Sequence, residues 1–133
     1  MNDPIDIFAR TIWGEARGEG NMGMVAVACV IMNRVKHGGW WGNDVLSVCQ
    51  KPFQFSCWNE NDPNREKLIA VDGTDTQFVE ATAIAVRVSA GDYTDLTNGA
   101  DSYYDRRMAT PPIWAANLVP TASIGHHIFY QTV

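Results

Sequence analysis

The sequence contains few cysteines and no long apolar segment. Its three cysteines, Cys29, Cys49 and Cys57, form no Cys-x-x-Cys pair, which indicates neither a disulfide framework nor a zinc site, so we expect reduced side chains packed in the core. The longest apolar run, residues 24–32, is far too short to cross a bilayer. The amino terminus, Met-Asn-Asp-Pro, has neither the basic residues nor the apolar stretch of a signal peptide. We therefore expect no membrane insertion and a chain that stays in the cytoplasm until something releases it.

Concentrated positive charge is also missing. The 133 residues include ten Lys and Arg against fifteen Asp and Glu, a formal net charge of −5, and the closest basic grouping is Arg106–Arg107. Nucleic-acid affinity depends on neutralising phosphates, so we expect no nucleic-acid partner. The composition, 46% hydrophobic and 19% charged, is that of an ordinary soluble globular protein. No internal repeat or low-complexity linker interrupts the chain, which favours one domain over residues 1–133.

Capping and turn residues divide the chain into helices followed by a β region. Two Asp-Pro pairs, each an N-cap before a proline at the first helical position, predict helices from Pro4 to about Arg17 and from Asp62 to about Val71. We expect further helices at 22–36, 44–50 and 75–90 and a helix start at 111–112, strands at 102–104 and 128–130, and a strand or extended segment at 52–58. The predicted fold class is α+β, mainly helical, with a small sheet.

Two glutamates, Glu15 and Glu19, lie among three glycines where the first predicted helix ends. On a helical wheel Glu15 falls on the border of the apolar stripe, so we expect it to be half-buried. Burial and the negative end of the helix dipole both raise a carboxyl pKa, as a general acid requires. If the helix continued through Gly18, the two β-carbons would lie about 5–6 Å apart, close to the spacing of about 5–5.5 Å between the carboxyl groups of a retaining glycosidase. The alternative is a surface charge cluster around Arg17.

Four blocks of the sequence resemble one known family. They read WGEARGEGNMGMVAVACVIMNRVKHG, VCQKPFQFSCWN, GADSYYDRRMATPPIW and IGHHIFY. In this order and spacing they are similar to the cell wall hydrolase family that includes the catalytic domain of the bacterial spore-cortex-lytic enzymes, and the first block is the most specific. The resemblance implies a lysozyme-like fold and a single peptidoglycan-cleaving catalytic domain over residues 1–133 that acts on glycan strands without a cofactor.

The resemblance also implies that Glu15 is the catalytic acid. In a lytic transglycosylase one carboxyl group protonates the oxygen between N-acetylmuramic acid and N-acetylglucosamine. As a carboxylate it then takes the proton of the muramic acid C6 hydroxyl, which closes a 1,6-anhydro ring without water. Glu19 would then orient Arg17, bind substrate, or shift the pKa of Glu15 by like-charge repulsion. A lysozyme-like muramidase that uses both glutamates and a non-catalytic peptidoglycan-binding or structural module are the alternatives.

Four further residues are predicted to bind substrate. By the resemblance, Gln54 in the Gln-Phe-Ser block lines the cleft and hydrogen-bonds sugar groups, whereas Ser56 is equally well a strand residue that faces solvent. Neighbouring residues of a strand point to opposite faces, so of Tyr103 and Tyr104 we expect one in the cleft and one in the core. An aromatic face in the cleft suits the apolar side of a sugar ring.

The adjacent histidines His126 and His127 do not predict a metal site. On a strand they face opposite ways, and no third histidine or clustered carboxylate stands at ligand spacing, so we expect no metal. The resemblance places one of the pair at the wall of the site, and we assign His126 there. Asn33, on a buried helix, is expected to make structural hydrogen bonds. Asp105 stands where the family usually has asparagine, which leaves the local sugar contacts open.

The biological setting follows from the resemblance and from what the sequence lacks. A chain with its own Met1, no signal peptide and no separate wall-binding module is similar to a phage or prophage endolysin, made in the cytoplasm and released through a membrane lesion. The alternative is a catalytic domain excised from a longer secreted enzyme. In either case we expect a monomer whose partner is the glycan strand of peptidoglycan.

Overall fold

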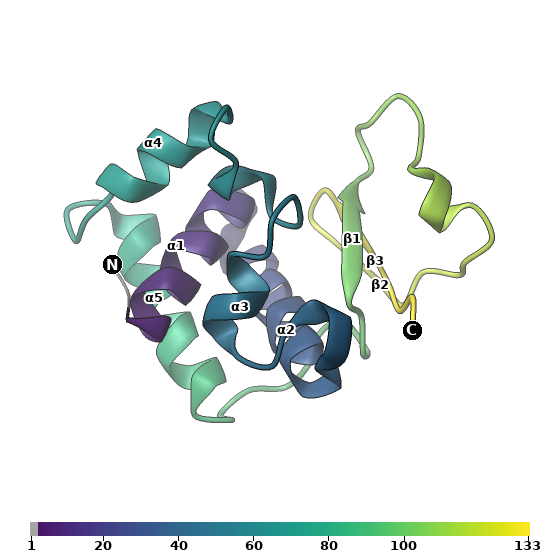
Figure 1. Ribbon diagram of the computed structural model, residues 1–133, viewed down its shortest axis with the longest axis horizontal. Coiled ribbons are helices and arrows are strands. Elements are labelled where there is room, and N and C mark those ends of the chain that lie inside the picture. The colour runs from purple at the N-terminus through teal and green to yellow at the C-terminus, as the bar shows by residue number, and fades with distance from the viewer. Residues whose placement is uncertain (1–2) are drawn as a thin grey trace.

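The computed structural model describes residues 3–133, in which five α-helices come first along the chain and a three-stranded sheet follows (Figure 1). The helices are α1 (Pro4–Ala16), α2 (Gly20–His37), α3 (Val45–Cys49), α4 (Pro63–Ala70) and α5 (Thr76–Ser89), with 3-10 helices η1 (Gly39–Trp41), η2 (Ser56–Trp58) and η3 (Ile113–Ala115). The strands are β1 (Ser102–Asp105), β2 (Ala122–Ile124) and β3 (His127–Tyr130). The prediction of a mainly helical α+β fold is confirmed.

Aspartate caps determine where most of the helices begin. In four helices an aspartate carboxylate accepts a hydrogen bond from a backbone N–H of the first turn: Asp3 for α1, Asp44 for α3, Asp62 for α4 and Asp75 for α5. The helix α1 ends at Ala16, and Gly18 takes a left-handed φ of 87° directly after it. The predicted bounds of these helices are confirmed to within one or two residues.

The helix α2 lies between two apolar clusters. Val27 and Ile31 belong to the main core, which α1 shares with the other helices. Ala26 and Val30, on another side of α2, pack with Phe129 of the sheet. The helix α2 is apolar on nearly every side because other helices cover one side of it and the sheet covers another.

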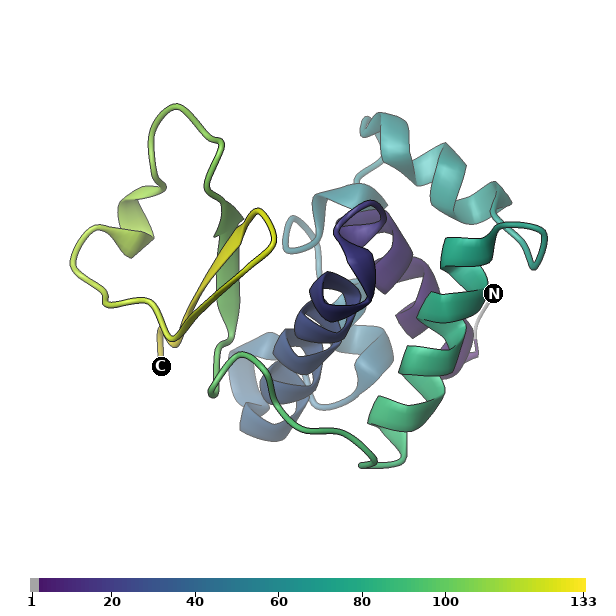
Figure 2. The ribbon, with the colours of Figure 1, turned by 180° about the vertical axis from the view of Figure 1, so that it is seen from behind.

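The sheet is antiparallel, with the strand order β1-β3-β2. Tyr103 of β1 pairs with Phe129 of β3, so both side chains lie on the face toward α2. Tyr104 lies on the opposite face, where its ring stacks on Tyr130 with 5.9 Å between centroids. Figures 1 and 2 show the sheet beside the helices, with the connection 106–121 on its far side. One face of β1 is thus turned toward the helices and the other toward this connection.

Two predictions of local structure are wrong. Residues 52–58 form turns and the 3-10 helix η2 rather than a strand. Phe55 and Cys57 are buried and Ser56 is exposed, so the alternation is real, but it arises from a tight turn against α1 and α4. The strand β2 is absent from the sequence prediction because its three residues carry too little alternation to mark a strand.

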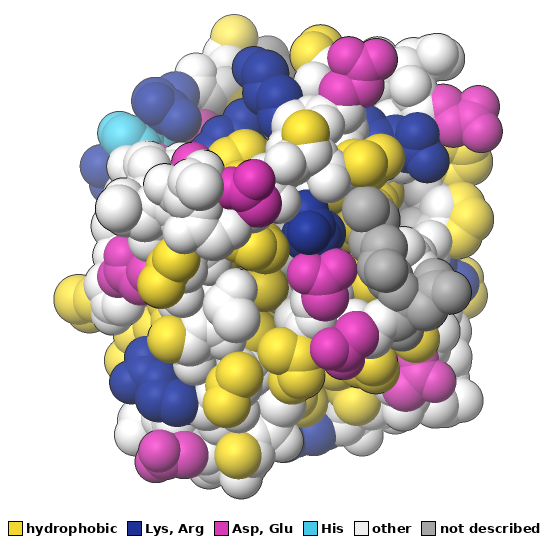
Figure 3. Space-filling model, turned by 90° about the vertical axis from the view of Figure 1, so that its left-hand side faces the viewer, with side chains coloured by type: hydrophobic (Ala, Val, Ile, Leu, Met, Phe, Trp, Pro, Cys, Tyr) yellow, Lys and Arg dark blue, Asp and Glu magenta, His cyan; other side chains and the backbone are white. Residues whose placement is uncertain are grey.

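The surface carries charges of both signs. Figure 3 shows acidic and basic side chains interspersed on the face where α4 and α5 lie, with apolar side chains between them. Within residues 3–133 no helix combines the length and the apolar character that crossing a bilayer requires.

Gly14 lies where η2 and α4 come closest to α1, and it supplies a test of this packing. A Cβ added at Gly14 would lie 3.1 Å from both Cβ and Sγ of Cys57 and 3.2 Å from Cδ2 of Leu68. Alanine gains about 1 kcal/mol of helix propensity over glycine. We nevertheless expect Gly14→Ala to lower the free energy of unfolding by about 1–2 kcal/mol, because its neighbours must shift.

Urea unfolding measures this difference. Gly73→Ala is the matched control, since a Cβ at Gly73 meets nothing within 4 Å. A Gly14→Ala protein as stable as the wild type would contradict the close approach of η2 to α1.

Candidate active site

Glu15 lies in the last turn of α1, where this helix meets η2 and the sheet. The Tyr103 hydroxyl on β1 donates a hydrogen bond to Oε1 of Glu15 over 2.5 Å. Burial raises the pKa of Glu15, and hydrogen bonds from Tyr103 and Cys57 together with the charge of Arg34 offset part of this rise. The side chain keeps a limited exposure to solvent. Glu15 therefore combines a raised pKa with access, as a proton donor requires.

Tyr103 is held as a hydrogen-bond donor. Burial, followed by the negative charge of Glu15, raises the pKa of Tyr103 well above its usual value, so its hydroxyl keeps its proton. On the same face of the sheet its ring lies 4.7 Å from that of His127 and 5.5 Å from that of Phe129, centroid to centroid. These contacts fix the hydroxyl against Glu15.

A cavity of about 430 Å³ adjoins the Tyr103 side chain. Its walls are Arg34, Trp40, Trp41, Phe53, Gln54, Ser102, Tyr103, Trp114 and Thr132. Aromatic faces suit the apolar faces of a sugar ring, and amide and hydroxyl groups suit its polar edge. The cavity therefore has the lining expected of a saccharide site, and Tyr103 joins it to Glu15.

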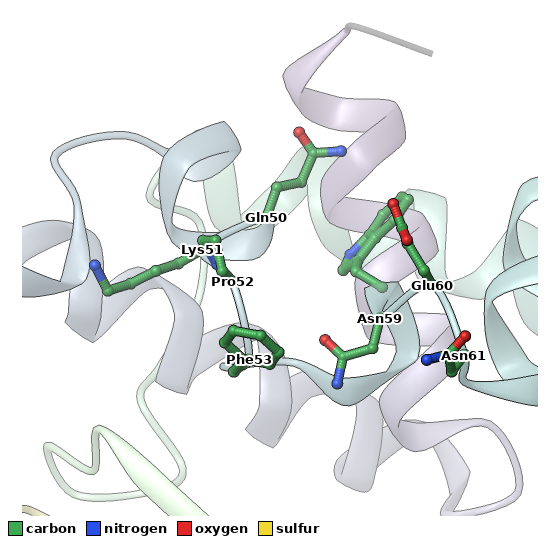
Figure 4. Close-up of a pocket in the computed structure, with 8 residues that line it drawn as sticks. Gln50, Lys51, Pro52, Phe53, Asn59, Glu60 and Asn61 are labelled. Carbon is green, nitrogen blue, oxygen red and sulfur yellow. The ribbon is translucent and has the colours of Figure 1, made fainter.

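Phe53 also borders a second cavity, of about 600 Å³. Figure 4 shows Gln50, Phe53 and Asn59 around this hollow, while Lys51 extends away from it, and the Lys51 ammonium lies 4.4 Å from the centroid of the Trp40 ring. Phe53 is 85% exposed and has a φ of 65°, a strained conformation for a bulky residue. A strained backbone that holds an apolar ring in solvent between two cavities points to a binding role for Phe53.

The structure brings some of the predicted site residues together. Gln54 and Tyr103 line the cavity of about 430 Å³. Ser56 is exposed at the start of η2, and Tyr104 lies on the far face of the sheet against Tyr130. The two tyrosines are split between faces as strand alternation predicts, but Tyr104 packs beside the connection 106–121 and not in the main core.

Glu19 is turned toward the β2–β3 hairpin. Its Oε1 accepts a hydrogen bond of 2.8 Å from the backbone N–H of His126, and its Oε2 lies 2.8 Å from Nδ1 of the same residue. A carboxylate can only accept, so Nδ1 carries the proton. Although burial acts to raise the pKa of Glu19, the hydrogen bonds from His126 lower it. Gly125 permits this contact, because it has a φ of 58° and an added Cβ would lie 2.8 Å from Oε1 of Glu19.

Three residues to which the sequence prediction gives no role lie near the Glu15–Tyr103 pair. Cys57 contacts the Glu15 carboxyl group, and Arg34 lines the cavity beside Tyr103. His127, and not His126, packs its ring on Tyr103. Strand alternation carries the signal for His127, which shares a face with Phe129, whereas no local pattern indicates Cys57.

Asn33 and the three cysteines have structural surroundings in the helical core. Asn33 donates hydrogen bonds to Oδ2 of Asp95 over 2.9 Å and to the Ala100 carbonyl over 2.8 Å, as its buried helix predicts. The three cysteines are free and buried, and burial raises the pKa of Cys29 to about 11 and that of Cys49 to about 12. Residues 3–133 hold no group of three potential metal ligands.

Comparison with known sequences places this chain in a family. Residues 18–130 match the sequence profile of the family described as Cell Wall Hydrolase. The chain belongs to the Cell Wall Hydrolase family. The match begins three residues after Glu15, so the profile covers Tyr103, Arg34 and Glu19 but not Glu15.

A longer relative extends the likeness to nearly the whole chain. The spore cortex-lytic enzyme of Halalkalibacterium halodurans is 30% identical over 128 residues, which are 96% of this chain and 34% of that protein. The chain therefore spans about a third of the length of this curated relative.

Two solved catalytic domains share the fold of this Cell Wall Hydrolase chain. The catalytic domain of the Bacillus cereus SleB protein has a TM-score of 0.75 and 28% identity, over 98% of this chain and 91% of that one. The catalytic domain of the germination-specific lytic transglycosylase SleB from Bacillus anthracis has a TM-score of 0.73 and 27% identity, over 98% of this chain and 96% of that one.

The contact between Glu19 and His126 predicts a pH-dependent contribution to stability. Because the folded protein lowers the pKa of Glu19, its contribution is complete above the unfolded value and is lost as the pH falls through the lower, folded value. At pH 7 we expect Glu19→Gln to reduce the free energy of unfolding by about 1–2 kcal/mol. The difference from the wild type is expected to shrink progressively below about pH 4.3.

Urea unfolding at a series of pH values measures this effect. Glu60→Gln is the control, since Glu60 is exposed. If the loss in Glu19→Gln stayed constant down to pH 2, the Glu19 carboxylate would not be the group that holds the hairpin.

Proposed function

We propose that this chain is a peptidoglycan-cleaving domain that cuts the glycan strand between N-acetylmuramic acid and N-acetylglucosamine by lytic transglycosylation. The observation that carries the proposal is the partly buried hydrogen bond between Tyr103 and Glu15, which ties one carboxyl group of raised pKa to a residue of the cavity wall. The Cell Wall Hydrolase match and the likeness to a catalytic domain named as a lytic transglycosylase support this chemistry.

In the first step Glu15 gives its proton to the glycosidic oxygen. The bond from that oxygen to C1 of the muramic acid breaks, and the N-acetylglucosamine unit leaves with the proton. Burial favours the protonated form of Glu15 before substrate arrives, since it raises the carboxyl pKa. Tyr103, which donates to Oε1, holds the carboxyl group in one orientation during this transfer.

In the second step the Glu15 carboxylate takes the proton of the C6 hydroxyl of the muramic acid. The C6 oxygen then forms a bond to C1, which closes the 1,6-anhydro ring. The proton lost in the first step is regained in the second, and no water is consumed. One carboxyl group suffices for both steps, and Tyr103 donates to it throughout.

The alternative of a muramidase that uses two carboxylates finds less support. Both oxygens of Glu19 are engaged by His126, and the pKa values of Glu15 and Glu19 are shifted in opposite directions. A nucleophile needs a free oxygen directed at the sugar, so we assign Glu19 to the support of the hairpin. A non-catalytic binding module would not need the raised pKa of Glu15.

The setting inferred from the sequence, a phage or prophage endolysin acting as a monomer, stays a prediction. The relative compared above is named a spore cortex-lytic enzyme. What we propose for this chain is therefore the bond that is cleaved and the residues that cleave it.

Replacing Glu15 tests the proton donor. We expect Glu15→Gln to lower the rate of fragment release from purified peptidoglycan by about 10²–10⁴-fold, because glutamine keeps the shape of the side chain but has no acidic proton. Tyr103→Phe, which removes the donor to Oε1, is expected to lower the rate by about tenfold. Release is followed by chromatography of the soluble fragments, with Glu66→Gln, at an exposed glutamate of α4, as the control and thermal unfolding as the check of the fold.

Mass analysis of the same fragments tests the reaction type. We expect muramic acid ends one water lighter than the products of hydrolysis. Reducing muramic acid ends would favour the muramidase and restore Glu19 as a second catalytic group. Normal activity in Glu15→Gln would overturn the assignment of the proton donor, and binding of peptidoglycan without any release by the wild type would favour the non-catalytic module.

Phe53 tests the binding surface next to the proton donor. We expect Phe53→Gly to raise KM by about three- to tenfold with little change in kcat, because an aromatic contact with a substrate ring is lost. The variant should not be less stable, since the ring is 85% exposed and glycine adopts a φ of 65° without strain. Val119→Ala, at another 85% exposed side chain, is the control. An unchanged KM in Phe53→Gly would remove Phe53 from the substrate site.

A further inference from the structure

Arg34 is a nearly buried cation of the helix α2. It is 6% exposed, and its Nε donates a hydrogen bond of 2.6 Å to the backbone carbonyl of Asp101. Its guanidinium carbon lies 4.2 Å from the centroid of the Trp41 ring and 4.8 Å from that of Phe55. Within residues 3–133 Nη1 has no hydrogen-bond partner, and no carboxylate lies at salt-bridge distance from the group.

A buried charge of this kind is costly unless another charge compensates it. The aromatic faces of Trp41 and Phe55 supply part of the compensation. The Asp101 carboxylate is engaged elsewhere, since it accepts hydrogen bonds from the Ser102 hydroxyl and from Thr132. The charges of Asp101 and of a second acidic partner both act on Arg34.

That partner lies at the candidate active site. Arg34 and Tyr103 line the same cavity, and the Tyr103 hydroxyl is 2.5 Å from Oε1 of Glu15. The charge of Arg34 acts to lower the pKa of Glu15, and the charge of Glu15 acts to raise the pKa of Arg34. A guanidinium group keeps its proton in proteins, so the charge of Arg34 is permanent.

The other titratable groups that act on Glu15 are neutral near pH 7. Tyr103 faces it from β1, Cys57 from η2 and Cys49 from α3, and burial raises the pKa of each of them. Arg34 on α2 is therefore the group that brings a full positive charge to Glu15 from these four elements.

We propose that Arg34 is a positioning residue whose fixed positive charge stabilises Glu15 as a carboxylate once its proton has moved to the substrate. The inference rests on the proposed role of Glu15 as acid and then base. Before proton transfer Glu15 is neutral, and the charge of Arg34 is offset by Asp101 and by the two aromatic rings. After transfer the site holds two opposite charges away from bulk water, so the preorganised cation favours the transfer.

The pH dependence of kcat/KM tests the proposal. Activity requires protonated Glu15. The fall of activity at high pH, which is the basic limb of the pH profile, therefore reports the pKa of Glu15 in the free enzyme. Arg34→Met removes the charge and keeps an unbranched apolar stem between the two rings. We expect the basic limb to move up by about one pH unit and the maximal rate to fall by roughly tenfold, because the carboxylate loses its stabilising charge.

Two control variants separate charge from packing. Arg34→Lys keeps the charge, so we expect its basic limb to stay within about 0.3 pH unit of the wild type even if thermal stability falls. Arg87→Met, at an exposed arginine of α5, is expected to leave both the limb and the rate unchanged. A basic limb that stays in place in a folded Arg34→Met protein would overturn the proposal.

The variants still test the proposal if Arg34→Met does not fold. In that case a basic limb that moves by a full pH unit in Arg34→Lys would overturn the proposal, because the charge is still present there. Failure of the proposed function is distinguished by Glu15→Gln: if that variant is active, Glu15 is not the proton donor. If it is inactive and the limb of Arg34→Met does not move, only the role of Arg34 fails.

Discussion

The hydrogen bond between Tyr103 and Glu15 joins two parts of the chain that are 88 residues apart. It requires α1 to end at Ala16, so that the carboxyl group reaches the sheet, and it requires η2 to approach α1 closely at Gly14. It also requires β1 to turn Tyr103 toward the helices. Each of these conditions is local, but the bond forms only when the sheet is docked on α2. The candidate site is thus a product of the whole fold.

The two glutamates of the same segment show how environment separates identical side chains. Glu15 stays on α1 and meets a phenol, a thiol and the charge of a guanidinium group, in a setting where burial dominates and raises its pKa. Glu19 lies beyond the left-handed Gly18, where a backbone N–H and an imidazole of His126 favour its ionised form. The break at Gly18 therefore turns an apparent pair into a proton donor and a structural clamp.

The sequence predicts the helices well, because aspartate caps, prolines and glycines act within one turn of the positions that they mark. It predicts the half-buried border position of Glu15 for the same reason. It does not predict the partner of Glu19 or the role of Arg34, which depend on contacts across 107 and 67 residues. The alternation at 52–58 predicts a strand wrongly, since a tight turn between two packed helices produces the same pattern.

The central claim is that burial raises the pKa of Glu15 above its ordinary value although Tyr103, Cys57 and Arg34 all favour its ionised form. Infrared difference spectroscopy between the wild type and Glu15→Gln isolates the carbonyl band of this one carboxylic acid and follows it with pH. We predict that the band persists at pH values above the ordinary glutamate pKa of about 4.3. Loss of the band at or below that ordinary value would contradict the account, because Glu15 would then have no proton to give.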